Sequence, residues 1–314
     1  MWHEPNCPST AHRRAAYILG RRSARMILVY NANGTTGSGV VGALVAQGHA
    51  VRAVVRDAER ARTTLPPGVE VIAAPLLDPA GLERVLPPAL AGVHAMYVAT
   101  PACPELPAIE RALGRAAAAA GVARIAKLGG IRVEDESIPP LMGKLHARGW
   151  AALRDSGVPV VHLRAGFYMQ NLLMAAGAIR SGVLPATTRG AKMAFVDARD
   201  LARCAAAVLT EDGHDGKSYD LTGPVGLSFH DVAAILGEVL HREVACLDVD
   251  DAAFRAGAIE GGAPAWVVDR LLELYDHVRT TDFAAAPTDA VQRLTGRAPI
   301  DLARFVLEHR AAFD

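Results

Sequence analysis

The sequence predicts an α/β fold: a doubly wound parallel sheet flanked by helices, with a smaller α/β lobe at the C-terminal end. Short apolar runs rich in β-branched residues alternate with helical segments through the first half of the chain. The first run leads directly into a glycine-rich turn and a helix. The chain has 314 residues, of which 51% are hydrophobic and 21% charged, so it can bury a core of this size.

Six apolar runs are expected to form the strands of the sheet. Each is four to six residues long and is bounded by turn residues or by a helical segment. They are residues 27–30, 50–55, 69–73, 95–99, 124–128 and 160–164.

Three of the connecting segments carry clear helix signals. Residues 78–86 begin with Asp-Pro, which suits a helix N-terminus. Residues 105–120 are rich in alanine, the strongest helix former, and end at Gly121. Residues 141–156 end at the stop signal "SGVP".

The rhythm changes after residue 164. A loop runs into a helix, and "MAFVDARDLARCAAAVLT" then predicts a short strand and a helix capped by Asp197 or Asp200. Residues 217–250 predict a strand, a turn, a helix and a strand, with Ser228 and Asp231 as a capping pair. Residues 251–283 are mainly helical in pattern.

These patterns divide the chain into three parts. Residues 26–165 are expected to form a nucleotide-binding domain, and residues 166–314 a smaller substrate-binding lobe interwoven with it. Residues 1–25 are arginine-rich, but their apolar stretch is too short for a signal peptide. We expect a poorly ordered extension or the product of an upstream start codon there, with a docked arm or dimer tail as the alternative.

Composition argues against several classes of protein. Lys+Arg and Asp+Glu both number 33, which gives no electrostatic reason for binding nucleic acid or an anionic membrane. No run approaches the roughly 20 apolar residues of a membrane span. The four cysteines form neither a CxxC pair nor a cluster with histidines, so no disulfide framework and no metal site is predicted. A cytoplasmic location follows from the usual cysteine rule.

The turn after the first strand has the spacing of a dinucleotide site. Asn31, Gly34 and Gly37 are three residues apart. Gly34 would let the backbone approach a pyrophosphate, and Gly37 would let the helix pack closely on the strand. The free N–H groups at the helix start favour phosphate. Asparagine is the best replacement for glycine at a positive φ, so Asn31 is compatible with the turn.

Arg56 indicates which dinucleotide binds. It lies 19 residues after Gly37, at the end of the second strand. An acidic residue there would suit an unphosphorylated ribose, whereas an arginine suits a 2′-phosphate. Asp57 should point to the opposite face of the strand. The sequence therefore favours NADP(H) over NAD(H).

Taken together, these segments resemble the NmrA-like branch of the atypical short-chain dehydrogenase/reductase superfamily, which includes NAD(P)H:quinone-reductase-like proteins. The similarity runs from about residue 26 to the C-terminus and is carried by "NANGTTG", "VRAVVRD", "VATP", "SGVPVVHLRAGFYMQNLL", "FVDARDLARCAAAVL" and "KSYDLTGP". The resemblance implies a Rossmann fold, bound NADP(H), and either reduction of a quinone- or ketone-type substrate or redox sensing without turnover.

The resemblance also implies further cofactor contacts. They lie in the pyrophosphate turn, in the loop after the fourth strand, at the end of the fifth strand, and in an aromatic loop over the nicotinamide. In that order they are Thr35 and Thr36, Thr100 and Pro101, Lys127, and Phe167.

The usual Ser-Tyr-Lys residues of the superfamily are missing at the matching positions. The tyrosine and lysine positions hold Met142 and His146, and the serine pair is Gly129 and Gly130. His146, with an ordinary pKa near 6.5, could act as a general acid or a hydrogen-bonding group at neutral pH. Tyr168 could offer a phenol to the substrate or form a wall of the pocket. These two are the candidate catalytic residues.

Without a positioned acid, reduction of a simple ketone would lose roughly 10²–10⁴-fold in rate, whereas a quinone or enone delocalises the incoming charge. The leading hypothesis is an NADPH-dependent reductase of a small hydrophobic quinone- or enone-like substrate. One alternative is a non-catalytic NADP(H) sensor that binds a regulatory protein. Another is a non-redox isomerase or cyclase. A homodimer is also compatible with the sequence.

Overall fold

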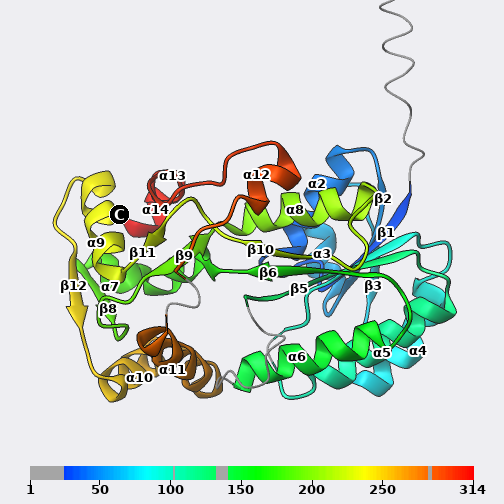
Figure 1. The fold of residues 1–314 in the computed structure, drawn as a ribbon, viewed down its shortest axis with the longest axis horizontal. Coiled ribbons are helices and arrows are strands. Elements are labelled where there is room, and N and C mark those ends of the chain that lie inside the picture. Colours follow the sequence, from blue (N-terminus) through cyan, green and yellow to red (C-terminus); the bar gives the residue numbers. More distant parts are fainter. Residues whose placement is uncertain (1–24, 102, 132–140, 282–284) are drawn as a thin grey trace, which may run out of the picture.

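The computed structural model describes residues 25–101, 103–131, 141–281 and 285–314. A parallel sheet with helices on both faces fills one half of the molecule, and a second group of elements fills the other (Figure 1). The strands of the sheet follow the order β10-β6-β5-β4-β1-β2-β3, and every neighbouring pair is parallel. The chain starts in the middle and reverses direction between β1 and β4, which makes this a doubly wound Rossmann sheet. The predicted fold class is confirmed.

Each of the six predicted runs forms a strand of this sheet, with ends shifted by at most two residues. The seventh strand, β10, comes from the predicted C-terminal lobe. The strands are β1 (Met26–Tyr30), β2 (Ala50–Val55), β3 (Glu70–Ala73), β4 (Ala95–Val98), β5 (Arg124–Gly130), β6 (Val160–Ala165) and β10 (Ser218–Leu221).

Alternate residues of the strands enter two separate cores, because successive side chains point to opposite faces. In β1, Ile27 and Val29 pack in one core while Leu28 and Tyr30 pack in the other. The first core is covered by α2 (Gly37–Ala46), α3 (Ala58–Thr64), α8 (Ala198–Thr210) and α12 (Ala290–Thr295). The second is covered by α4 (Pro79–Ala89), α5 (Leu106–Ala119) and α6 (Leu141–Arg154).

The remaining elements surround a third core. Two small sheets, β11-β9-β7 and β12-β8, form its frame. Ser228 and Asp231 make the predicted capping box at the start of α9, and Asp197 caps α8. These elements are β7 (Phe167–Tyr168), η1 (Met169–Ala175), α7 (Ala176–Arg180), β8 (Val183–Ala186), β9 (Met193–Val196), β11 (Gly226–Leu227), α9 (Phe229–Leu240), β12 (Ala245–Asp248), α10 (Asp251–Glu260), α11 (Ala265–Thr280), α13 (Leu302–Glu308) and α14 (Arg310–Phe313).

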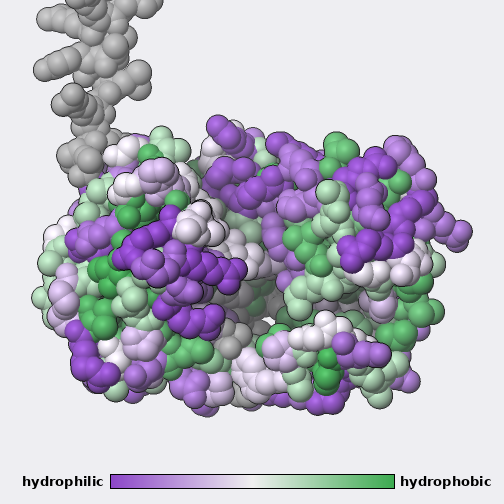
Figure 2. Space-filling view, turned by 180° about the vertical axis from the view of Figure 1, so that it is seen from behind, coloured by the Kyte–Doolittle hydropathy of each residue, from purple (hydrophilic) through white to green (hydrophobic). Residues whose placement is uncertain are grey.

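The part of the chain after residue 165 contributes to both halves. It supplies β10 to the large sheet and α8 and α12 to the face of that sheet. On the side opposite to that of Figure 1, the surface is hollowed between the two halves (Figure 2). No helix in the described ranges is long and apolar enough to cross a membrane. The predicted extension, residues 1–25, lies outside the described residues except for Arg25.

Candidate cofactor and substrate site

The turn after β1 has the predicted conformation. Asn31 adopts a φ of 58°, in the left-handed region where asparagine is tolerated. Its carbonyl accepts a hydrogen bond from the N–H of Gly34 at 3.0 Å. Its side-chain Nδ2 donates to the carbonyl of Ala99 at 3.1 Å. The asparagine therefore preserves the turn and also fastens it to the loop after β4, a bond that glycine could not make.

Close contacts explain why glycines follow Asn31. A Cβ on Gly37 would collide with the Asn31 carbonyl oxygen, and one on Gly34 would lie 2.8 Å from Asn31 Nδ2. The N-cap residue of α2, Thr36, makes no side-chain hydrogen bond to the helix. The first N–H groups of α2 thus face the turn without a side-chain cap. This arrangement fits a bound pyrophosphate, because it offers N–H donors and the positive end of the helix dipole.

The two threonines of the turn have different environments. Thr35 is exposed, whereas Thr36 is buried and its Oγ1 lies 2.9 Å from the hydroxyl of Tyr97 on β4. Thr36 can therefore meet a phosphate only through its backbone N–H. The Thr36 side chain ties the turn to the sheet, and the contact of this residue with the cofactor stays a prediction.

Arg56 is exposed directly beyond the carboxyl end of β2. The neighbouring Asp57 accepts a hydrogen bond from the N–H of Arg60 at 3.0 Å and so caps α3. No carboxylate among the described residues forms an ion pair with Arg56. Its guanidinium is thus free to meet an anion at the strand end, as a 2′-phosphate site requires.

The loop after β4 leads to a buried ion pair. Lys127 was predicted at the end of its strand, but it is the fourth residue of β5 and is fully buried. Its Nζ lies 2.7 Å from Oε1 of Glu110 on α5, which is also fully buried. Burial raises the pKa of Glu110, while the Lys127 ammonium and the Thr100 hydroxyl oppose this rise. The predicted position of Lys127 at the end of its strand is therefore wrong, because the residue lies in the interior of β5 and is paired with Glu110, which the Thr100 hydroxyl also meets. Its contact with the cofactor stays a prediction.

His146 lies beside this pair on α6. Burial and the nearby Lys127 and His162 lower the pKa of His146 well below its ordinary value. The imidazole is therefore neutral at pH 7, and the expectation of a general acid titrating near neutral pH is wrong. No described residue hydrogen-bonds to its buried Nδ1. His146 can still act as a neutral hydrogen-bonding group.

His162 occupies the space beside Gly129, one of the two positions that match the usual serine pair. It is fully buried on β6, and its ring stacks on Trp150 of α6 with centroids 4.3 Å apart. A Cβ added to Gly129 would lie 2.5 Å from His162 Nε2. The space that a serine side chain would need is occupied by this imidazole.

Phe167 and Tyr168 point to opposite sides of β7. Phe167 packs in the third core, where its ring stacks on Tyr275 with centroids 6.4 Å apart. Tyr168 packs against the first core near Tyr97, and burial raises its pKa above the ordinary value. The Tyr168 phenol thus keeps its proton at any ordinary pH. Both residues are only partly buried, so their roles at cofactor and substrate remain predictions.

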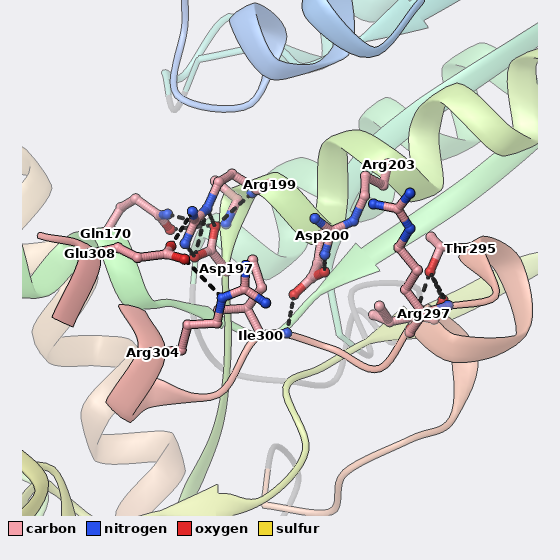
Figure 3. A network of polar contacts seen from close by, with 12 residues as sticks. Gln170, Asp197, Arg199, Asp200, Arg203, Thr295, Arg297, Ile300, Arg304 and Glu308 are labelled. Carbon is pink, nitrogen blue, oxygen red and sulfur yellow. Dashed lines mark hydrogen bonds and ion pairs between the residues drawn. The ribbon is translucent and has the colours of Figure 1, made fainter. Parts of the chain in front are cut away.

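A polar clamp holds the segment that follows Tyr168. The side-chain amide of Gln170 donates to Asp197 at 3.1 Å and accepts the N–H of Ala198 at 3.0 Å (Figure 3). Asp197 is fully buried and is also paired with the guanidinium of Arg199. These bonds hold the segment that follows Tyr168 against the start of α8.

Two of these groups could not be recognised from the sequence alone. Glu110 lies in an alanine-rich helix, where a glutamate usually faces solvent. Gln170 lies in an apolar loop, with only the Asp-Ala-Arg sequence at residue 197 as a remote signal. Each contacts a partner that is distant in the sequence: Glu110 contacts Lys127, and Gln170 contacts Asp197.

The comparison with known families agrees with this geometry. The model of the NmrA-like family matches residues 23–283. The chain belongs to the NmrA-like family. An NAD(P)H azoreductase from Xenophilus azovorans is 36% identical over 289 residues, covering 92% of this chain and 99% of the azoreductase.

Two solved structures are also similar to this chain. The NADPH-dependent quinone oxidoreductase QOR2 from Escherichia coli, complexed with NADPH, has a TM-score of 0.80 and 27% identity, covering 91% of this chain and 100% of that one. The triphenylmethane reductase of Citrobacter sp., complexed with NADP(H), has a TM-score of 0.78 and 26% identity, covering 90% and 99%. The bound cofactor is NADPH in the first structure and NADP(H) in the second.

Proposed function

We propose that this member of the NmrA-like family is an NADPH-dependent reductase of a small, flat, hydrophobic acceptor of the quinone or dye type. The observation that carries the proposal is the intact dinucleotide turn, with its uncapped helix start and exposed Arg56, beside a position where the proton-donating tyrosine is replaced by Met142. When bound, the nicotinamide supplies the hydride. The protein's own residues bind and orient the two reactants.

Each part of the site has an assigned task. The Asn31–Gly37 turn and the start of α2 hold the pyrophosphate, and Arg56 selects the 2′-phosphate. Tyr168, which precedes the segment held by the Gln170 clamp, forms part of the wall against which a flat substrate lies. His146 offers a neutral imidazole, which can hydrogen-bond to the substrate oxygen or nitrogen without delivering a full proton.

The substrate class follows from this neutral site. A simple ketone would need a proton at the moment of hydride arrival, whereas a quinone or an extended dye spreads the charge over its conjugated system. The names of the relatives, an azoreductase, a quinone oxidoreductase and a triphenylmethane reductase, support such acceptors. A homodimer or a regulatory protein partner would be compatible with the same cofactor site.

Steady-state oxidation of NADPH tests the proposal. The panel should contain several quinones, an azo dye, a triphenylmethane dye and a simple ketone as the negative control. We expect turnover with the conjugated acceptors, and slower turnover by at least about 10²-fold with the ketone. Tight NADP(H) binding by calorimetry, with no turnover on any acceptor, would instead support a sensor.

A further inference from the structure

Three side chains that commonly bind metal ions lie together on the C-terminal lobe. His230 is near the start of α9, and Cys246 and Asp248 are on β12. His230 Nε2 lies 3.1 Å from Asp248 Oδ2, and the three ligand atoms lie within 4.8 Å of one another. In Figure 1, α9 and β12 lie at one end of the molecule. The cofactor turn, which connects β1 to α2, lies at the other end.

The fold holds these three side chains in place independently of any ion. Cys246 and Asp248 are two residues apart on one strand and therefore point to the same face. That strand is paired with β8, and α9 packs beside it. The capping box of Ser228 and Asp231 fixes the first turn of α9, which carries His230. Ligands on regular elements are positioned more exactly than ligands on loops.

The distances suit a small four-coordinate ion. Tetrahedral zinc with sulfur, nitrogen and oxygen ligands needs about 3.3–3.8 Å between neighbouring ligand atoms. His230 Nε2 and Asp248 Oδ2 are already 3.1 Å apart and all three ligand atoms lie within 4.8 Å of one another, so small side-chain rotations would bring them to this spacing. The side chains of His230 and Asp248 are 50% and 49% exposed, which leaves an open side for a water ligand.

We propose that His230, Cys246 and Asp248 form a binding site for a zinc-like divalent ion. A thiolate ligand disfavours magnesium and calcium, and the mixture of thiolate, imidazole and carboxylate suits zinc or cobalt. On binding, Cys246 loses its proton to solvent and coordinates as the thiolate, while His230 coordinates as the neutral imidazole. The ion would join α9 to β12 and so stiffen the C-terminal lobe.

This site could not be expected from the sequence, because 15 residues separate the histidine from the cysteine without any motif. An ordinary hydrogen bond between His230 and Asp248 is the competing explanation. It would involve two of the three residues and would leave Cys246 uninvolved. The thiol is thus the residue that separates the two explanations.

Titration of the metal-free full-length protein with Co²⁺ tests the site, because a bound thiolate gives cobalt a charge-transfer absorption band in the near ultraviolet. We expect this band in the wild type, its displacement by Zn²⁺, and an upward shift of Tm with Zn²⁺. Cys246→Ser should abolish the band. His230→Ala and Asp248→Asn should weaken Co²⁺ binding by at least about tenfold, since even losing a residue that only supports a ligand typically costs that much.

The N-terminal segment supplies a necessary control. It contains His3, Cys7 and His12, which could bind cobalt by themselves. Cys7→Ser should keep the band unchanged, and the buried Cys103 and Cys204 should not contribute. A band that survives Cys246→Ser, or no band in the wild type with excess Co²⁺, would overturn the proposal.

Discussion

Replacing Lys127 by methionine should destabilise the protein strongly and in a pH-dependent way. The substitution keeps the length of the side chain but removes the ammonium 2.7 Å from Glu110 Oε1, where both side chains are fully buried. Breaking a buried pair by removing one partner typically costs 3–5 kcal/mol, because an uncompensated charge stays behind. The protein can limit this cost by protonating Glu110.

The protonation of Glu110 sets the expected magnitude. A pH of 7 is about 2.7 units above the ordinary glutamate pKa of about 4.3, and each unit corresponds to about 1.36 kcal/mol. Protonating Glu110 in the folded variant therefore costs about 3.7 kcal/mol, which is the upper limit of the expected loss in the free energy of unfolding. In the variant, folded Glu110 binds a proton that the unfolded chain has released. The free energy of unfolding therefore falls as the pH rises above about 4.3. At pH 5.5 the expected deficit is only about 1.6 kcal/mol.

Urea unfolding of both proteins between pH 5 and 8 measures this deficit. The double variant Glu110→Gln/Lys127→Met serves as the control, because it removes both charges and should recover much of the loss. A second readout is the imidazole pKa of His146 by NMR, which should rise when the positive charge of Lys127 is removed. A deficit under about 1 kcal/mol without pH dependence would show that the pair is not ionised and would refute this reasoning.

Three further predictions concern the cofactor site. Arg56→Ala should weaken NADPH binding by roughly ten- to hundredfold while leaving NADH binding nearly unchanged, measured by calorimetry; equal losses for both would contradict a 2′-phosphate contact. Gly37→Ala should reduce NADPH binding by more than about tenfold, because its Cβ meets the Asn31 carbonyl. In the same helix, Gly42→Ala meets nothing within 4 Å and should raise the unfolding free energy by about 0.5–1 kcal/mol without affecting binding. His146 is held neutral when folded but protonates in the unfolded chain below about pH 6.5, so its contribution to stability is lost as the pH falls. His146→Gln should therefore flatten the fall in unfolding free energy below that pH by up to about 1.4 kcal/mol per pH unit, and identical slopes would contradict a neutral imidazole.

Local signals were sufficient to predict most of the fold. The strands of the large sheet are continuous apolar runs because both faces of the sheet are covered, and such runs are visible in the sequence. The caps at Asp197 and Ser228 follow from hydrogen bonds within four residues, so they were visible as well. Asn31 was correctly expected at a positive φ because the preference belongs to that residue alone.

Contacts between distant segments could not be predicted in the same way. Lys127 was placed at the end of its strand because its pattern did not reveal the glutamate 17 residues earlier that meets it in the core. His146 was given an ordinary pKa because the charge of Lys127 and the burial by neighbouring helices are properties of the folded state. The imidazole of His162 behind Gly129 was missed for the same reason.

These missed contacts decide what chemistry the site can perform. Folding raises the pKa of the Tyr168 phenol and lowers that of the His146 imidazole, so both are held neutral at pH 7. Glu110 and Lys127 neutralise each other within the core. Tyr168 and His146 are therefore weak proton donors near pH 7, because a phenol with a raised pKa and a neutral imidazole give up a proton less readily than an ordinary phenol and an imidazolium do. With these two residues facing the acceptor, as proposed, an acceptor that spreads the incoming charge over a conjugated ring system depends least on a nearby proton donor.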